Sequence, residues 1–252
     1  EEEYWMYSIA EKISDIGDYL TAKAFAHFIH YLRTGDESHQ LEISNLIACA
    51  GKQYTTIGDY RSYVLLISIG NYFKSLINNS TQKLIKSHLA NIQDEWKLYL
   101  RFLSTLGKFP MMSMWKSQQK ALQEGLLEDK SLIIAMPTSA GKTKTVEIAI
   151  YQALKNKPDS ICAYVVPTRA LAYEVENSLS TSLSRVNISV SILYGGYDFS
   201  QLEEDIIQDN QVFVLTPEKL DLLTRSNEEF KNKLALIIID EVHDSAAANP
   251  RS

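Results

Sequence analysis

Two short stretches of this sequence carry residue types that can bind and cleave a phosphate group. The first ends in Gly141-Lys142-Thr143, between an apolar run at 131–134 and a helical pattern at 145–150. Backbone N–H groups in such a turn, with a helix N-terminus behind them, form a nest for phosphate oxygens. The lysine reaches the β- and γ-phosphates, and the threonine hydroxyl suits Mg²⁺. The stretch therefore predicts a P-loop that binds a nucleotide, whereas Gly-Lys-Thr taken alone could also be an ordinary surface turn.

The second stretch is an aliphatic run at 234–239 followed by Asp240 and Glu241. Such a run predicts a strand buried on both faces of a parallel sheet. Its two carboxylates then lie at the carboxyl edge, where open α/β sheets place their ligands. Asp240 is suited to hold Mg²⁺, and Glu241 to orient and deprotonate an attacking water. The alternative is an ordinary solvated strand end, which the upstream P-loop makes less favoured.

The elements that must position these residues follow from the hydrophobic pattern between 110 and 252. Strands alternate with helical stretches, which predicts an α/β fold with a parallel sheet flanked by helices. The expected strands are 131–134, 161–166, 188–193, 211–215 and 234–239.

The N-terminal part predicts a separate, all-α domain over residues 1–109. Apolar residues recur there at three- and four-residue steps, and Pro110 marks the boundary because proline cannot continue a helix. This domain is either a docking or regulatory module or an extension that packs on its neighbour. Ile16–Tyr19 and Ile57–Tyr60 share the sequence Ile-Gly-Asp-Tyr, which is either a trace of a helical repeat or a coincidence. The expected helical stretches are 9–32, 41–50, 60–73, 84–92 and 96–106.

Composition places the chain among ordinary globular proteins, with 45% hydrophobic residues, 22% charged residues and a net charge of −6. The acidic balance disfavours a protein that coats itself with nucleic acid, although a local positive groove remains compatible with it. The two cysteines, Cys49 and Cys162, are expected to be core residues and cannot form a disulfide framework. An intracellular, cytoplasmic setting without a membrane span is the expectation.

Further polar residues accompany the two phosphate stretches. Gln118 precedes the P-loop, and its amide matches the donor and acceptor edge of adenine. Short polar turns follow three of the expected strands, where they could hold a phosphodiester backbone without reading its sequence. Each turn alone could be a plain strand–helix loop, but three in this order favour nucleic-acid binding. The turn residues are Pro167, Thr168, Arg169, Gly195, Gly196 and Thr216.

Together these motifs resemble the first motor domain of a superfamily 2 helicase of the DExH type, spelled here Asp240-Glu241-Val242-His243. The Pro137–Thr143 spelling is similar to the Ski-like and archaeal repair-helicase branch, with Met136 where that branch usually has alanine. The resemblance implies a RecA-like P-loop domain. It also implies an ATP- and Mg²⁺-binding loop, built here from Pro137, Thr138, Ser139, Ala140, Gly141, Lys142 and Thr143.

The same resemblance implies ATP hydrolysis coupled to movement along single-stranded or tailed nucleic acid, with His243 linking the two sites. DNA is slightly favoured over RNA as the partner. The segment 110–252 is expected to be truncated after the Asp-Glu-Val-His motif and inactive without a second motor domain. A protein partner such as a nuclease is expected. A bacterial anti-phage helicase, such as the Hachiman type, is one suggested setting. The alternative is an ATP-gated sensor or scaffold that grips nucleic acid and controls a partner without processive unwinding.

Overall fold

A computed structural model describes residues 2–89, 92–106, 110–137, 141–193 and 206–241 of the chain, with side chains from residue 8 onward. The chain divides into two compact units, Glu1–Trp115 and Lys116–Ser252. Residues 110–115 belong to the first unit, since Met111 donates its N–H to Leu103 and Met114 donates to Asn79, both at 2.8 Å. The expected all-α segment followed by an α/β segment is confirmed.

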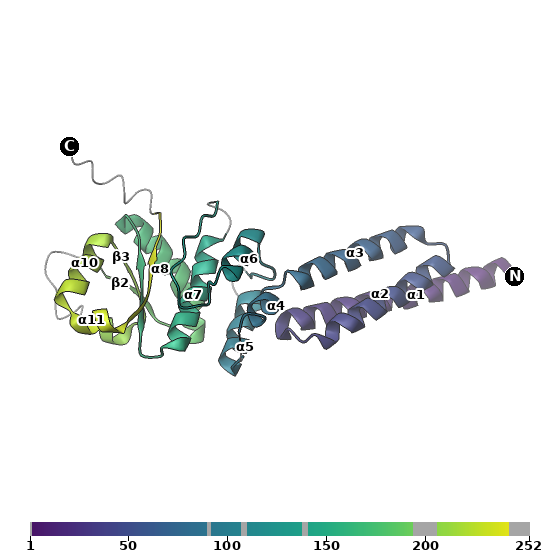
Figure 1. Cartoon of the computed structure of the whole chain (residues 1–252). Coiled ribbons are helices and arrows are strands. Elements are labelled where there is room, and N and C mark those ends of the chain that lie inside the picture. The colour runs from purple at the N-terminus through teal and green to yellow at the C-terminus, as the bar shows by residue number, and fades with distance from the viewer. Residues whose placement is uncertain (1, 90–91, 107–109, 138–140, 194–205, 242–252) are drawn as a thin grey trace. The chain divides into compact units, whose positions relative to one another are not determined.

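The first unit is helical throughout its described elements. Polar side chains start two of its helices, because Asp59 accepts a hydrogen bond from the N–H of Ser62 and Ser80 accepts one from that of Lys83. The elements are α1 (Glu2–Thr34), α2 (Ser38–Thr56), α3 (Tyr60–Asn78), α4 (Thr81–Lys86), α5 (Asp94–Arg101) and the π-helical turn η1 (Phe102–Leu106) (Figure 1).

The Ile-Gly-Asp-Tyr sequence takes two different structures, so it does not mark a structural repeat. Gly17 lies inside α1, where a Cβ would come within 2.8 Å of the Tyr54 ring. Gly58 instead forms the turn between α2 and α3, with φ +75° and open space around it. The first glycine serves close helix packing, and the second serves a left-handed turn.

The second unit is an α/β layer around a four-stranded parallel sheet in the order β2-β3-β1-β4. Its helices are α6 (Lys116–Gln123), α7 (Lys142–Asn156), α8 (Arg169–Leu183), the 3₁₀ turn η2 (Ser184–Val186), α10 (Pro217–Ser226) and α11 (Glu228–Lys233). Its strands are β1 (Ile161–Val165), β2 (Val190–Ile192), β3 (Val212–Leu215) and β4 (Leu234–Ile239).

The sheet has helices on both faces, with α10 and α11 on one side and α7 on the other (Figure 1). Ile161, Ala163 and Val165 of β1 pack toward Leu223 and Phe230 on the first side. The alternate side chains of β1 point the opposite way, because successive residues of a strand face opposite sides. Since the strands are parallel, their carboxyl ends share one edge of the sheet.

The structure corrects three sequence predictions. Residues 131–134 form no strand and pair with no ladder in the described chain, although exposure alternates along 131–137 and Ile133 is fully exposed. β4 is an edge strand with Ile239 55% exposed, not a strand buried on both faces. Among the described residues β4 pairs with β1 alone, so its other edge joins no ladder there and part of its apolar surface is exposed. Cys49 is exposed on α2, whereas Cys162 is buried in β1 as expected.

Candidate active site

The P-loop residues that the structure describes lie where helix α7 begins. Gly141 precedes the helix with φ +76°, a backbone conformation that favours glycine. A Cβ at this position would also come within 2.6 Å of Gln118 Nε2. The Gln118 amide donates a hydrogen bond of 3.2 Å to the Gly141 carbonyl, and the side chain is 1% exposed. The predicted adenine-reading glutamine thus packs directly on the P-loop backbone.

Lys142 and Glu241 meet although 99 positions separate them in the chain. Lys142 Nζ donates a hydrogen bond of 2.9 Å to Glu241 Oε1. The hydrogen bond to Glu241 raises the pKa of Lys142, burial opposes this, and the charges of Glu241 and Asp240 add to the rise. The ammonium group therefore keeps its charge at neutral pH, as phosphate binding requires.

The backbone of Glu241 is left-handed, with φ +48°. A non-glycine residue in this region costs roughly 1–3 kcal/mol, and such strain concentrates at functional sites. The strained conformation directs the carboxylate to Lys142, while the N–H of Glu241 donates to Asp240 Oδ1 at 2.9 Å. The two acids consequently take separate roles, one facing the P-loop lysine and the other held at the strand end.

Asp240 takes part in three hydrogen bonds at the end of the sheet, one of which is the bond from the Glu241 N–H to its Oδ1. Its N–H donates to the Val165 carbonyl at 2.9 Å, which extends the β1–β4 pairing by one residue. Its second carboxylate oxygen accepts a 2.8 Å hydrogen bond from the hydroxyl of Tyr164. Sequence reasoning missed Tyr164. The signal that could have identified it is its position in a buried strand that ends beside the acidic pair.

The donor set suits a magnesium ion. Thr143 follows Lys142 in the first turn of α7, and Asp240 is near enough to Lys142 for its charge to raise the lysine pKa. A hydroxyl and a carboxylate are the oxygen ligands that Mg²⁺ prefers alongside substrate phosphates. Within the described residues, no cluster of three or more His, Cys, Asp or Glu side chains could form an all-protein metal cage.

The predicted nucleic-acid residues that the structure describes lie at the same edge of the sheet. Thr168 and Arg169 are exposed and start α8 just beyond β1, and the Thr168 hydroxyl accepts the N–H of Leu171. Thr216 starts α10 just beyond β3, where Pro217 occupies the first helical turn. β1 and β3 are neighbours with Val165 opposite Leu215, so these two helix starts are adjacent.

Several predicted site residues lie outside the described part of the chain: Thr138, Ser139, Ala140, Gly195, Gly196 and His243. Pro137 is described as an exposed residue at the end of the extended segment, and Pro167 as half-buried between β1 and α8.

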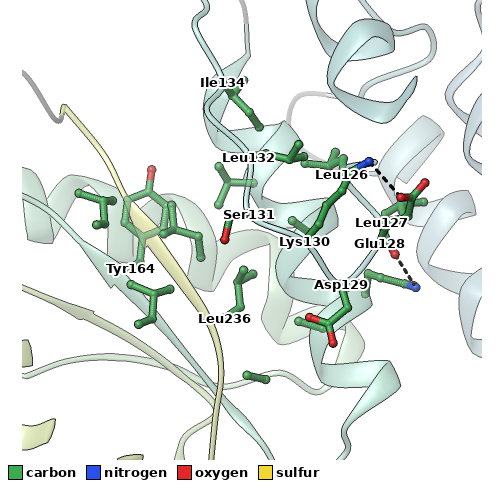
Figure 2. Close-up of a pocket in the computed structure, with 18 of the residues that line it drawn as sticks. Leu126, Leu127, Glu128, Asp129, Lys130, Ser131, Leu132, Ile134, Tyr164 and Leu236 are labelled. Carbon is green, nitrogen blue, oxygen red and sulfur yellow. Dashed lines mark hydrogen bonds and ion pairs between the residues drawn. The ribbon is translucent and has the colours of Figure 1, made fainter. Parts of the chain in front are cut away.

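A cavity of about 700 Å³ opens between the open edge of β4 and the segment 126–134 (Figure 2). Its apolar lining comes from Leu132, Ile134 and Leu236, and Tyr164 contributes from β1. Lys142 and Asp240 also border it. Two of the catalytic candidates therefore border a gap beside the sheet that has both apolar and polar lining residues.

The model of the family described as DEAD/DEAH box helicase matches residues 115–250. The chain belongs to this helicase family. Its match includes the P-loop, the strand β4 and the acidic pair that the structure brings together. The predicted resemblance to DExH-type helicases is thereby confirmed.

Curated relatives of this helicase segment include three long proteins. It is 33% identical to the Hachiman protein HamB of Bacillus cereus over 242 residues, which is 94% of this chain and 21% of that protein. It is 30% identical to the ATP-dependent DNA helicase Hel308 of Methanocaldococcus jannaschii over 57% of the chain and 12% of the relative. It is 31% identical to the RNA helicase DExH12 of Arabidopsis thaliana over 53% of the chain and 6% of the relative.

The helicase chain thus spans about a fifth of the length of HamB and smaller shares of the other two relatives. A solved structure of the DUF1998 helicase MrfA bound to DNA matches 62% of the chain and 22% of its own, with a TM-score of 0.48 and 20% identity. None of the helices in the described residues combines the length and apolar character needed to cross a membrane.

Proposed function

We propose that this chain carries half of the ATP site of a nucleic-acid helicase or translocase. ATP hydrolysis at Lys142, Asp240 and Glu241 would drive movement along a single strand bound at the adjoining edge of the sheet. The observation that carries the proposal is the 2.9 Å contact between Lys142 Nζ and Glu241 Oε1. It joins a phosphate-binding residue to a general-base candidate across 99 positions of sequence.

Each residue has a role that follows from its chemistry. Lys142 supplies a positive charge for the β- and γ-phosphates, while Thr143 and Asp240 would hold Mg²⁺, which neutralises charge developing on the phosphates. Glu241 orients water and accepts its proton. A triphosphate that takes the lysine must compete with Glu241 for it, so nucleotide binding would release the glutamate to act on water.

The nucleic-acid site follows from the position of the helix starts. The N-termini of α8 and α10 carry the positive ends of their dipoles at the sheet edge that holds Asp240. Thr168, Arg169 and Thr216 would contact phosphates and sugars there without reading bases. Because Val165 lies between these turns and Asp240, a shift at either site can reach the other through β1.

The remaining partners are also proposals. A second motor domain would complete the ATP site, and a protein such as a nuclease would work with the helicase. HamB matches 94% of this chain, so the match reaches the helical unit as well as the α/β unit. This supports a role in anti-phage defence, with the helical unit as a docking or regulatory part.

The test uses the full-length protein that contains this chain. ATP turnover is measured with and without single-stranded DNA, single-stranded RNA and tailed duplexes, in the wild type and in Lys142→Ala. Turnover should rise with nucleic acid in the wild type and be abolished in the variant. Near-normal turnover in Lys142→Ala would overturn the site assignment.

Strand separation on the tailed duplexes decides between the two functions compatible with the sequence. ATP-dependent unwinding supports a helicase. Nucleic-acid-stimulated turnover without unwinding or translocation would instead support an ATP-gated sensor.

A further inference from the structure

We propose that Tyr164 is a positioning residue for the ATP site, holding Asp240 in the orientation in which its carboxylate supports the nucleotide-bound magnesium ion. This rests on the proposed ATPase function. The Tyr164 hydroxyl donates a 2.8 Å hydrogen bond to Asp240 Oδ2. An ionised carboxylate only accepts hydrogen bonds, which fixes the direction of this one.

Each oxygen of the Asp240 carboxylate accepts one hydrogen bond. Oδ1 accepts the backbone N–H of Glu241 and Oδ2 accepts the phenol. A carboxylate offers about four lone-pair sites, so each oxygen keeps a site for a metal-bound water. With both oxygens held, the carboxylate cannot rotate about its terminal bond without breaking a contact. Partners of this kind orient metal-binding groups and commonly affect metal affinity.

The surroundings of Tyr164 hold its side chain in place. It is 1% exposed, and it lies on β1, which is flanked by β3 and β4. In Figure 2 its ring lies against β4, on the side of the cavity. Burial, followed by the charge of Asp240 and its hydrogen bond, raises the Tyr164 pKa far above its usual range. The buried ring and the 2.8 Å hydrogen bond fix the position of the hydroxyl.

The experiment compares Tyr164→Phe with Tyr31→Phe in the full-length protein. Tyr31 is also 1% exposed, and its hydroxyl forms a 2.9 Å hydrogen bond with Ser80 in the helical unit. Both substitutions remove one buried hydroxyl and keep the ring. Binding of a fluorescent ADP analogue is titrated with Mg²⁺ and repeated in EDTA, and circular dichroism checks that each variant is folded.

Tyr164→Phe should raise the Mg²⁺ concentration for half-maximal nucleotide binding about tenfold. Affinity in EDTA should stay at the wild-type value, and Tyr31→Phe should change neither quantity. In an Asp240→Asn background, adding Tyr164→Phe should have no further effect, because both changes act through one carboxylate.

An unchanged Mg²⁺ dependence in Tyr164→Phe would overturn the assignment, as would an equal loss of affinity in EDTA or an additive double variant. Failure of the proposed function has a different signature. In that case the wild type binds no nucleotide, or the Lys142→Ala variant binds nucleotide as well as the wild type does. Either result would also overturn the role of Tyr164.

Discussion

Lys142 Nζ and Glu241 Oε1 lie 2.9 Å apart, which makes the P-loop lysine and the general-base candidate direct partners. Both side chains are mostly buried, at 28% and 24% exposure. A phosphate that binds the lysine therefore displaces a carboxylate rather than bulk water. We propose that this competition links nucleotide binding to release of Glu241 as the base.

Glu241→Gln should keep or improve nucleotide binding while slowing hydrolysis about 10²- to 10⁴-fold. The amide no longer competes for Lys142 as an anion, but it cannot accept the proton of water. Single-turnover hydrolysis and equilibrium nucleotide binding measure the two effects in the full-length protein. Glu229→Gln, in the exposed pair with Lys233, is the control and should change neither. Fast single-turnover hydrolysis in Glu241→Gln would remove this residue from the role of base.

Gly141→Ala should lower the affinity for nucleotide more than Gly58→Ala does. Both glycines have φ near +75°, so both substitutions force alanine into a left-handed conformation at a cost of about 1 kcal/mol. At Gly58 the new Cβ enters open space, whereas at Gly141 it lies 2.6 Å from Gln118 Nε2. We expect only Gly141→Ala to weaken nucleotide binding. Equal nucleotide affinities in the two variants would show that the contact with Gln118 does not shape the P-loop.

Lys144→Met should destabilise the α/β unit by about 3 kcal/mol, because it leaves a buried carboxylate without its lysine. Lys144 Nζ lies 2.7 Å from Glu147 Oε2, and Glu147 is 1% exposed. Lys144 also donates to Ser182 Oγ at 2.7 Å, which ties α7 to α8. Urea unfolding followed by circular dichroism gives the change in free energy.

The matched control is Lys233→Met, which breaks the exposed pair with Glu229. Exposed pairs of this type contribute only about 0.3–0.5 kcal/mol. Equal losses in Lys144→Met and Lys233→Met would mean that the interior pair adds no more than a surface pair.

Cys162 should resist thiol reagents at pH 8 while Cys49 reacts, as peptide mapping after alkylation can show. Burial raises the pKa of the Cys162 thiol to about 12 from the ordinary 9.0. The unfolded thiol therefore loses its proton at a lower pH than the folded one, and alkali favours unfolding. Ionisation of Cys162 therefore leaves the free energy of unfolding unchanged below about pH 9 and lowers it as the pH rises toward 12.

The alkaline effect has its own control. Cys162→Ala should lose stability less steeply with rising pH than the wild type, whereas Cys49→Ala should follow the wild type. Identical alkaline slopes in all three proteins would contradict the assigned effect of burial on Cys162.

Arg169→Ala should weaken binding of single-stranded nucleic acid regardless of sequence. Loss of one phosphate contact should reduce the slope of log affinity against log salt by about 0.7. Arg225→Ala, which removes an exposed arginine paired with Asp221, should leave the slope unchanged. Equal slopes in wild type and Arg169→Ala would place the strand elsewhere.

The amino-acid sequence was sufficient to predict the helical and α/β halves and four of the five expected strands. It also indicated the residues for which phosphate chemistry is proposed. These follow from local signals. Apolar residues at periods of 3.6 and 2 define elements, and glycine, lysine, threonine and acidic residues at fixed positions define a motif. Lys142, Asp240 and Glu241 were recognisable because residue type and neighbouring pattern are enough to predict their chemistry.

Which side chains are in contact depends on the three-dimensional fold. Residues 131–134 have strand character, but a strand requires a ladder partner, and the described chain supplies none beside them. The sequence of β4 predicts a fully buried strand, yet β4 lies at the edge of the described sheet, because the order of the strands depends on the whole topology. Tyr164 became a site residue through a hydrogen bond that spans 76 positions. Such contacts depend on strand register and burial, which no local pattern records.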